Sequence, residues 1–403
     1  MKIYLVGGAV RDNLLGNPVQ ERDWVVVGST PQEMLELGYR QVGKDFPVFL
    51  HPKTHEEYAL ARTERSTGRG YAQFSFDVSP SVTLEEDLLR RDITINAMAQ
   101  TPEGKIIDPY NGQADLHHKI IRHVSAAFAE DPVRILRVGR FSARYAFTLA
   151  SETRQLMRNM VRAGEIDALV PERVWQELSR ALGEPYPEKF FEVLRECGAL
   201  KILFPEINTL YGIPNPPKWH PEIDTGIHTM MVLTQAVRLS LEPVVRFAAL
   251  LHDVGKGVTP MSDWPSHHNH EALGVPLVKA LILRYRIPRE FAELAVMVVQ
   301  HHGHCHGILA MKPSTIIKLL EQLDAFRRPA RFEQFLLACE ADSRGRPSFE
   351  DHAYPQADYL RTMYHAANKV IVQSLLEKGF QGKALGDALH QARIDAIKAV
   401  SKT

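Results

Sequence analysis

The first 27 residues constrain the fold most, because they join two apolar runs through a glycine turn and a short polar stretch. Lys2–Val6 and Asp23–Val27 predict buried strands, and Ala9–Leu15 predicts a helix between them. The turn is Gly7-Gly8, and glycines let a backbone approach a phosphate closely. A helix that starts directly after such a turn directs its N–H groups at the anion. This order predicts a unit that mixes strands and helices, with a phosphate site at its first turn.

Acidic side chains flank the same turn. Alternate residues of a strand point the same way, so Glu21 and Asp23 are expected to project together and to hold two Mg²⁺ ions. The alternative is a solvated pair of charges at the start of a strand. Arg11 is expected to contact a triphosphate, while Asp12 either orients Arg11 or is an ordinary carboxylate at a helix start. Glu57, on a further predicted strand, is either a third metal-binding carboxylate or a surface residue.

The secondary-structure pattern changes near residue 125. Before it, further strands are predicted at 46–50, 57–61, 106–107 and 120–121, and further helices at 31–37 and 84–99. After it, helical periodicity dominates, with helices at 133–145, 151–162, 171–182 and 188–197. Four prolines within 212–221 indicate a linker. We therefore expect a catalytic head at 1–125, a helical neck and body at 126–211, a linker at 212–224, a helical domain at 225–345 and a helical tail at 346–403.

Composition narrows the class of protein. No apolar stretch approaches the roughly 18 residues of a membrane span, and the short run before Arg11 is no signal peptide. Three widely spaced cysteines favour a reducing cytoplasm over a disulfide scaffold. The net charge is zero, but seven arginines face two acidic residues between Asp131 and Arg162, a local excess of +5. Such a patch can neutralise phosphates, although a solvated helix face has the same pattern.

Four linked motifs resemble one known family, the bacterial class II tRNA nucleotidyltransferases, or CCA-adding enzymes, of the DNA polymerase β superfamily. They occur in the family's order and cover residues 1 to about 220. The family usually has Asp-x-Asp where this chain has Glu21-x-Asp23, which extends one carboxylate by a methylene and puts the relative metal preference in question. The motifs are Gly7-Gly8-Ala-Val-Arg11-Asp12, Glu21-x-Asp23, Arg90-Arg91-Asp92-x-Thr-Ile-Asn96-Ala-Met and Glu130-Asp131-Pro-Val-Arg134-Ile-Leu-Arg137.

The resemblance implies an α+β fold, with a polymerase-β-like head built on a small mixed sheet, an all-helical neck and body, and an all-helical HD domain. It implies that Arg91 contacts the nucleotide and Asp92 the ribose, although charges in the middle of a helix are ordinarily exposed. It also implies that Asp131 and Arg134 take the pairing edge of the incoming base, as carboxylate and guanidinium groups can. A structural ion pair between these two residues is the alternative. The later arginines, Arg137 and Arg140, would hold the triphosphate.

A second site is indicated in the C-terminal half, where an apolar run ends in His252-Asp253. Together with His228 and Asp342, this pair resembles the signature of HD-superfamily phosphohydrolases. Imidazole and carboxylate ligands suit a transition metal, with Ni²⁺ as the candidate. Lys256 could bind a substrate phosphate. Two histidine clusters could hold a second metal, chiefly through His270 and either His301 or His302, or could be incidental polar residues in loops; they are His267-His268-Asn269-His270 and His301-His302-Gly-His304-Cys-His306.

The resemblance implies an enzyme that adds C, C and A to tRNA from CTP and ATP without a nucleic-acid template. The HD domain would act as a 2′,3′-cyclic phosphodiesterase, 2′-nucleotidase and phosphatase. Alternatives are a poly(A) polymerase, an enzyme that adds only CC or only A, and a nucleotide-sensing or RNA-binding module with an inactive transfer site. We expect Mg²⁺ dependence, a cytoplasmic protein with tRNA and no membrane as partner, and either a monomer or a homodimer.

Overall fold

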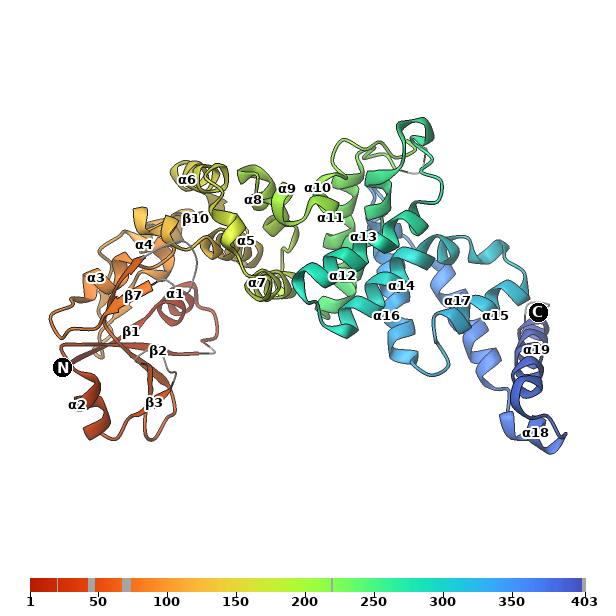
Figure 1. Cartoon of the computed structure of the whole chain (residues 1–403), viewed down its shortest axis with the longest axis horizontal. Coiled ribbons are helices and arrows are strands. Elements are labelled where there is room, and N and C mark those ends of the chain that lie inside the picture. The colour runs from red at the N-terminus through yellow and green to blue at the C-terminus, as the bar shows by residue number, and fades with distance from the viewer. Residues whose placement is uncertain (20, 43–47, 67–73, 219, 401–403) are drawn as a thin grey trace. The chain divides into compact units, whose positions relative to one another are not determined.

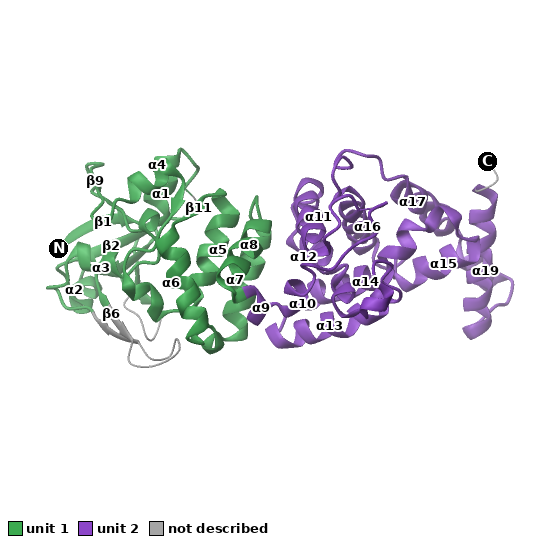
Figure 2. Cartoon of the chain, turned by 90° about the horizontal axis from the view of Figure 1, so that it is seen from above, with its two compact units in different colours: residues 1–199 green, residues 200–403 purple. Residues whose placement is uncertain are grey.

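The structure is a computed structural model that describes residues 1–19, 21–42, 48–66, 74–218 and 220–400 (Figure 1). The chain divides into two compact units, unit 1 at Met1–Ala199 and unit 2 at Leu200–Thr403 (Figure 2). Residues 46–47 of the strand predicted at 46–50 lie outside the described residues, as does Trp219 in the proline-rich stretch.

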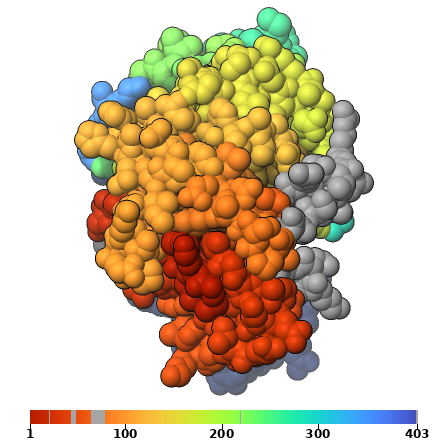
Figure 3. Space-filling view, turned by 90° about the vertical axis from the view of Figure 1, so that its left-hand side faces the viewer, coloured from red at the N-terminus to blue at the C-terminus, as the bar shows by residue number. Residues whose placement is uncertain are grey.

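A mixed sheet of seven strands forms the centre of the N-terminal part of unit 1, in the order β3-β4-β5-β2-β1-β8-β9. The middle strand, β2, is antiparallel to β1 and parallel to β5. Figure 3 shows the N-terminal end of the chain, in dark red, at the surface between orange segments of unit 1. The strands are β1 (Lys2–Val6), β2 (Asp23–Val27), β3 (Arg40–Val42), β4 (Val48–Leu50), β5 (Glu57–Leu60), β8 (Ala99–Gln100) and β9 (Ile106–Ile107).

Apolar clusters cover both faces of this sheet. Successive residues of β2 point to opposite sides, so neighbouring valines belong to different clusters. Val25 packs in one apolar cluster with Leu88, and Val26 packs in the other with Met34. The helices that supply these partners begin at capping boxes, in which Thr30 and Thr83 accept from the backbone of the third helical residue. The helices of this region are α1 (Gly8–Leu15), α2 (Pro31–Glu36), α3 (Leu84–Leu89) and α4 (Gly112–His118).

The helix predicted at 84–99 is wrong in its second half. α3 ends at Leu89, and the 3₁₀ turn η1 (Thr94–Asn96) and strand β8 follow it. The backbone of Ile93 bridges to His123, and the Thr94 N–H donates to the Arg122 carbonyl. These long-range pairings replace helical hydrogen bonds, so the motif that starts at Arg90 lies in a turn rather than in the middle of a helix.

The helices of the neck and body follow their predicted bounds closely. Three of them match the prediction, and α7 is one residue longer than predicted. Two short strand pairs, β6 with β7 and β10 with β11, complete unit 1. These elements are α5 (Val133–Tyr145), α6 (Ser151–Arg162), α7 (Pro171–Gly183) and α8 (Glu188–Cys197), with β6 (Thr63–Ser66), β7 (Phe74–Asp77), β10 (Ile120–Ile121) and β11 (Thr148–Leu149).

Unit 2 is helical throughout its described residues, which confirms the predicted fold class. Residues 245–251 of α12 are all buried, and all of them except Arg246 are apolar. Among the described residues, no helix has the length and apolar character to cross a membrane. The helices are α9 (Ala199–Leu203), α10 (Pro205–Asn208), α11 (Thr225–Leu239), α12 (Pro243–Leu251), α13 (His270–Tyr285), α14 (Arg289–His306), α15 (Pro313–Gln322), α16 (Pro329–Arg344), α17 (Pro355–Asn368), α18 (Val372–Glu377) and α19 (Gly382–Val400), with the 3₁₀ turn η4 (Val254–Val258) after α12.

Candidate active sites

Three adjacent strands bring the N-terminal candidate residues to one place. Asp23 at the start of β2 is opposite Val6 at the end of β1 and opposite Glu57 at the start of β5. The glycine turn, Asp23 and Glu57 therefore meet at one edge of the sheet and line a cavity of about 930 Å³. Glu21 also lines this cavity, but it lies two residues before β2, so the expectation that both carboxylates belong to one strand is wrong.

The electrostatics of this acidic cluster favour a cation. Desolvation by the atoms around the cavity raises the pKa of Asp23, Arg91 opposes this effect, and the nearby Glu21 adds to it. All three carboxylates are exposed toward solvent. A divalent cation would remove the repulsion between them, and exposed carboxylate oxygens that leave room for water and phosphate oxygens are the ligands that Mg²⁺ prefers. The residues present therefore fit Mg²⁺.

The glycine turn leaves no room for a side chain. Gly7 has a φ of +70°, which L-residues rarely adopt, and a Cβ there would lie 2.8 Å from Nη1 of Arg91. Helix α1 begins directly afterwards, at Gly8. The free N–H groups of its first turn and the Arg91 guanidinium thus adjoin the same turn, as a phosphate site requires.

Arg11 is held in place from several sides. Its Nε and Nη2 donate to the two oxygens of Asp12, both at 3.0 Å, and its Nη1 donates to Asn96 Oδ1. Tyr145 donates to Asp12 at 2.9 Å. Arg11 and Asp12 are both buried. The geometry agrees with the interpretation in which Asp12 orients Arg11, whereas an ordinary helix-start carboxylate would be solvated.

The buried Asp92 forms an ion pair with the partly exposed Arg137, whose Nε donates to its Oδ2 at 2.7 Å. Asn96 and the backbone N–H of Ile93 donate to its Oδ1. Burial would raise the pKa of Asp92, but Arg137 and these hydrogen bonds outweigh it and hold the pKa well below its usual range. The expected ribose contact through Asp92 and triphosphate contact through Arg137 therefore involve two side chains that already hold each other.

The predicted base-reading pair has other partners in this structure. Asp131 accepts from Arg173, at 3.1 Å from Nη1 and 2.8 Å from Nη2. Arg134 donates to the backbone carbonyls of Ala127, at 2.9 Å, and Arg90, at 2.7 Å. Helix α5 begins at Val133, so Asp131 precedes it, and both the base-reading role of Asp131 and Arg134 and the structural ion pair between them stay predictions.

Sequence reasoning missed the contribution of α7 to this cavity. Arg173 and Glu177, one helical turn apart, hold Asp131 and Arg140, and Glu177 lies 2.6 Å from Nε of Arg140. Their i, i+4 spacing placed them on one helix face, which was the available signal. The partner of each could not be known without the packing of α7 against α5.

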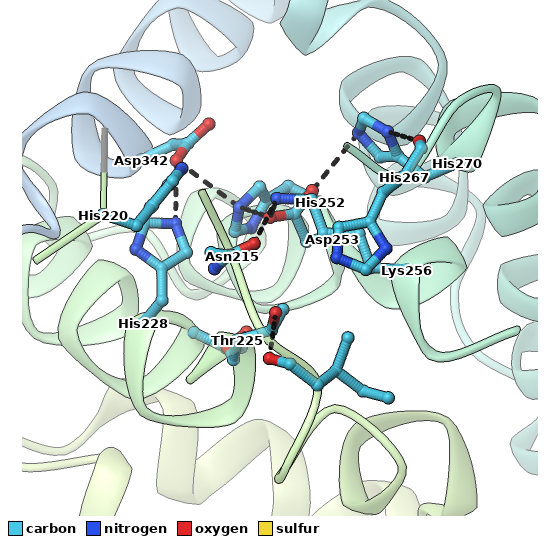
Figure 4. A network of polar contacts seen from close by, with 12 residues as sticks. Asn215, His220, Thr225, His228, His252, Asp253, Lys256, His267, His270 and Asp342 are labelled. Carbon is cyan, nitrogen blue, oxygen red and sulfur yellow. Dashed lines mark hydrogen bonds and ion pairs between the residues drawn. The ribbon is translucent and has the colours of Figure 1, made fainter. Parts of the chain in front are cut away.

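In unit 2, the four predicted HD residues converge from three helices (Figure 4). His228 lies on α11, His252 and Asp253 follow α12, and Asp342 lies on α16. Nε2 of His228 lies 3.0 Å from Asp342 Oδ1, and Nε2 of His252 lies 3.4 Å from the same oxygen. Because α12 is buried on all sides, the residues at its C-terminal end are buried as well.

Two histidines of this cluster turn their Nε2 atoms toward the carboxylate of Asp342. Nδ1 of His252 bonds the Ala249 carbonyl at 2.8 Å, and Nδ1 of His228 lies 3.0 Å from the Gly345 carbonyl. A carbonyl oxygen only accepts, so the ring proton is on Nδ1, and Nε2 of the neutral ring carries a lone pair. Both Nε2 atoms face Asp342 Oδ1, so each contact requires a proton on the nitrogen or a metal cation between nitrogen and oxygen.

A second group of ligands adjoins the first through Asp253. Its Oδ1 lies 3.3 Å from Nε2 of His270 and 3.6 Å from Nε2 of His302, while its Oδ2 lies 3.1 Å from Nε2 of His252. His270 and His302 also bond backbone carbonyls through Nδ1. His302 rather than His301 belongs to this group. These histidines lie at the start of α13 and on α14, so the alternative of incidental loop residues is wrong for them.

The HD cluster requires positive charge. Burial lowers the pKa of His252, but Asp253 and Asp342 more than offset this effect and raise it to about 10. A proton thus resides there when no metal does. Nε2 of His252 and Oδ1 of Asp253 are buried without a hydrogen-bond partner among the described residues. Orphaned ligand atoms in a nitrogen and oxygen donor set fit transition metals.

Lys256 supplies a positive charge to the same cluster. Its Nζ lies 2.7 Å from Asp253 Oδ2 and donates to Asn215 Oδ1 at 3.0 Å. Gly255 makes this arrangement possible, because a Cβ there would lie 1.9 Å from the carbonyl oxygen of His270. The close approach of η4 to α13 therefore brings Asp253 within reach of the second group of ligands.

The stretch predicted as a linker contributes Asn215, His220 and Glu222 to the surroundings of the cluster. Glu222 Oε1 lies 2.9 Å from Nδ1 of His228. Burial would raise the pKa of Glu222, but hydrogen bonds from His220 and His228 lower it to about 2. The mixture of histidine, glutamate and asparagine with prolines was a signal that the sequence interpretation did not use.

A further histidine holds Asp342 from the opposite side. Nε2 of His306 lies 2.7 Å from Asp342 Oδ2, and the Tyr354 hydroxyl lies 2.8 Å from its Nδ1. Because the carboxylate only accepts, Nε2 donates, and Nδ1 of the neutral ring accepts from the Tyr354 hydroxyl, which also lies 3.4 Å from Cys305 Sγ. Asp342 is thereby oriented with its Oδ1 toward His228 and His252.

Three family models match successive parts of the chain. The model described as "Poly A polymerase head domain" matches residues 3–122, and "Probable RNA and SrmB- binding site of polymerase A" matches residues 146–210. The model described as "HD domain" matches residues 225–328. Asp342 and Glu222 lie outside that last match.

Curated relatives align with the whole chain. A "Multifunctional CCA protein" from Thioalkalivibrio sulfidiphilus is 65% identical over 99% of this chain and 98% of its own length. Another from Nitrosococcus oceani is 59% identical over 100% of this chain and 99% of its own length.

Solved structures share the fold. The Thermotoga maritima CCA-adding enzyme complexed with tRNA is 23% identical with a TM-score of 0.63, over 98% of this chain and 86% of that one. The Bacillus stearothermophilus CCA-adding enzyme in complex with CTP is 24% identical with a TM-score of 0.59, over 98% and 88%. At these sequence identities, the structural similarity shows a shared fold and nothing more.

Proposed function

Because the chain belongs to the family of multifunctional CCA proteins, we propose that it adds C, C and A to the 3′ end of tRNA and that its second unit hydrolyses phosphate esters. The observation that carries the first activity is the meeting of the Gly7 turn, Asp23 and Glu57 on three adjacent strands, at one arginine-lined cavity. A phosphate-binding turn, metal-binding carboxylates and arginines are the groups that transfer of a nucleotide from a triphosphate requires.

In the proposed reaction, the tRNA 3′-hydroxyl oxygen bonds to the α-phosphorus of CTP or ATP while the bond to the β-phosphate breaks, and pyrophosphate leaves. Asp23, Glu57 and Glu21 would hold Mg²⁺, which activates the hydroxyl and neutralises the leaving phosphates when bound. Gly7, the first turn of α1 and Arg11 bind the triphosphate. The fixed position of Arg11 on Asp12 reduces the reorganisation that this binding requires.

Base selection would fall to Asp131 and Arg134. A carboxylate accepts from the amino group of cytosine or adenine, and a guanidinium donates to ring nitrogen and carbonyl groups. Arg173 and two backbone carbonyls occupy these side chains in the present structure. A base that binds these two side chains would compete with the present contacts or use their remaining donors and acceptors.

A tRNA transcript that ends at the discriminator base tests this proposal. A full enzyme extends it by two residues with CTP alone, by none with ATP alone, and by three with both nucleotides. A ladder with ATP alone would indicate a poly(A) polymerase, and extension that stops short with both would indicate a partial enzyme. No Mg²⁺-dependent incorporation would indicate a nucleotide-binding module without catalysis.

For unit 2, the observation that favours a second activity is the convergence of unpartnered imidazole and carboxylate atoms. His228, His252, Asp253 and Asp342 would hold a transition metal such as Ni²⁺, with His270 and His302 available for a second ion. A metal bound there lowers the pKa of water, so that hydroxide can attack a phosphoester. Lys256, next to Asp253, would bind a substrate phosphate oxygen.

Candidate substrates of unit 2 are 2′,3′-cyclic phosphates, 2′-nucleotides and simple phosphate esters. Release of each product from these compounds, with and without Ni²⁺, distinguishes the three activities. We place both reactions in the cytoplasm, because the three cysteines are free thiols and all are buried.

A further inference from the structure

Glu222 is a buried acidic residue in the proline-rich stretch before α11. Only 3% of its side chain is exposed, and its Oε1 lies 2.8 Å from Nδ1 of His220 and 2.9 Å from Nδ1 of His228. Burying a carboxylate is costly unless it is well paired, so two imidazole donors at one oxygen mark a defined arrangement.

The contact with Glu222 determines which ring nitrogen of His228 donates a hydrogen bond. Nδ1 must donate, because Glu222 and the Gly345 carbonyl both only accept. In the neutral ring, Nε2 then carries the lone pair. This Nε2 atom lies 3.0 Å from Asp342 Oδ1. A negative charge on the far side of the ring also makes Nε2 a stronger donor to a cation.

His220 holds the carboxylate in this position. It donates to the same oxygen that His228 contacts, and the two rings meet edge to face, with centroids 4.6 Å apart and planes 84° apart. Figure 4 shows His220, His228 and Asp342 together on one side of the network. The carboxylate is therefore fixed against the His228 ring rather than free to turn toward solvent.

We propose that Glu222 is a positioning residue of the HD metal centre, which orients His228 and strengthens its bond to a divalent cation. The inference rests on the proposed phosphohydrolase function of unit 2. It makes the proline-rich stretch a part of the metal centre and not only a connection. The competing interpretation is an ordinary buried ion pair that stabilises the fold and has no effect on metal binding.

Metal affinity of the full-length protein distinguishes the two. The protein is stripped with a chelator and titrated with Co²⁺, whose visible absorption reports both binding and ligand geometry. Replacing a group that orients a metal ligand weakens binding by about 10- to 100-fold. We expect Glu222→Ala to fall near the tenfold end of this range, because the Gly345 carbonyl still accepts from Nδ1 of His228.

Glu222→Gln should lose less, about threefold, because its amide oxygen keeps the hydrogen bond while the charge is gone. If Glu222→Ala does not fold, the Co²⁺ affinity of Glu222→Gln distinguishes a positioning residue from an ordinary ion pair. Glu290→Ala, an exposed glutamate on α14, is the matched control and should bind Co²⁺ as the parent does. His252→Ala, which removes a proposed ligand, identifies the signal of this centre.

Affinity and absorption unchanged within twofold in both Glu222 variants would overturn the inference. A lower unfolding temperature of the metal-free Glu222→Ala protein, with that unchanged affinity, would assign Glu222 to the fold alone. If the parent protein shows no Co²⁺ signal that His252→Ala removes, the phosphohydrolase proposal fails as well, and the two failures are thus distinct.

Discussion

The two candidate sites differ in where their ligands lie. In unit 1, Glu21, Asp23 and Glu57 offer only oxygen atoms, and all three are exposed toward a cavity. In unit 2, His252 and Asp253 are buried, and imidazole nitrogens join the carboxylates. An open set of oxygen ligands leaves coordination positions for the triphosphate and water, whereas a buried mixed set holds its ion by itself.

The sites also differ in how they meet phosphate charge. The cavity of unit 1 is lined by ten arginines, so the protein itself neutralises a triphosphate. Beside the HD carboxylates, the nearest cationic side chain is Lys256. We therefore expect phosphate binding in unit 2 to depend on metal ions as well as on Lys256. The ten are arginines 11, 62, 90, 91, 134, 137, 140, 144, 173 and 180.

The comparison breaks most directly if one substitution abolishes both activities. Asp23→Ala should reduce nucleotide addition about a thousandfold or more, because several kcal/mol of transition-state stabilisation depend on the bound metal. It should leave phosphohydrolysis intact. His252→Ala should do the reverse, and each variant's retained activity is its own folding control. Loss of both activities in a folded variant would contradict separate sites.

Metal removal should affect the two units differently, because the candidate ligands are buried in unit 2 and exposed in unit 1. Stripping the ions should lower the thermal stability of unit 2, because buried ligand atoms lose their cation, while unit 1 stays unchanged. An ion present at about 100 times its Kd contributes roughly 2.7 kcal/mol, or about 5–10 °C for a unit of this size. Hydrogen exchange of peptides from α11 and from α5, with and without chelator, measures each unit. Equal loss of protection in both would contradict this expectation.

A smaller effect is expected for triphosphate binding by Arg11. Asp12→Asn removes the charge that fixes Arg11, and one charge-assisted hydrogen bond is worth about 1.5–3 kcal/mol. KM for CTP and for ATP should rise about tenfold or more, with little change in kcat. Asp167→Asn, an exposed residue of the same unit, is the control. An unchanged KM would show that Arg11 needs no support from Asp12.

The smallest effect concerns the hydroxyl that bonds His306. Tyr354→Phe removes one neutral hydrogen bond, worth about 0.5–1.5 kcal/mol, so phosphohydrolysis should fall about two- to tenfold. Nucleotide addition should not change. A measured rate equal to that of the parent would mean that His306 orients Asp342 without help.

The sequence predicted what depends on local pattern. Strand β1, the helix after Gly7 and three helices of the neck and body could be read from periodicity and turn residues. The end of α3 could not, because the strand-like bridge between Ile93 and His123 joins residues far apart in the chain. A local helical pattern there yields to long-range pairing.

The candidate sites divide in the same way. His228, His252, Asp253 and Asp342 were predicted, and the structure brings them together. The groups that hold them were not, since a partner such as Glu222 carries no motif of its own. Which atom of each histidine faces the site follows from backbone carbonyls, and their positions depend on how the helices pack.

Gly255 links the two groups of HD ligands. A Cβ there would meet the His270 carbonyl at 1.9 Å, so any side chain must push η4 away from α13. A single methyl group would act as a wedge between Asp253 and the pair His270 and His302, while His228 and Asp342, on other helices, stayed where they are. The spacing between the halves of this centre is therefore set by the absence of one carbon atom.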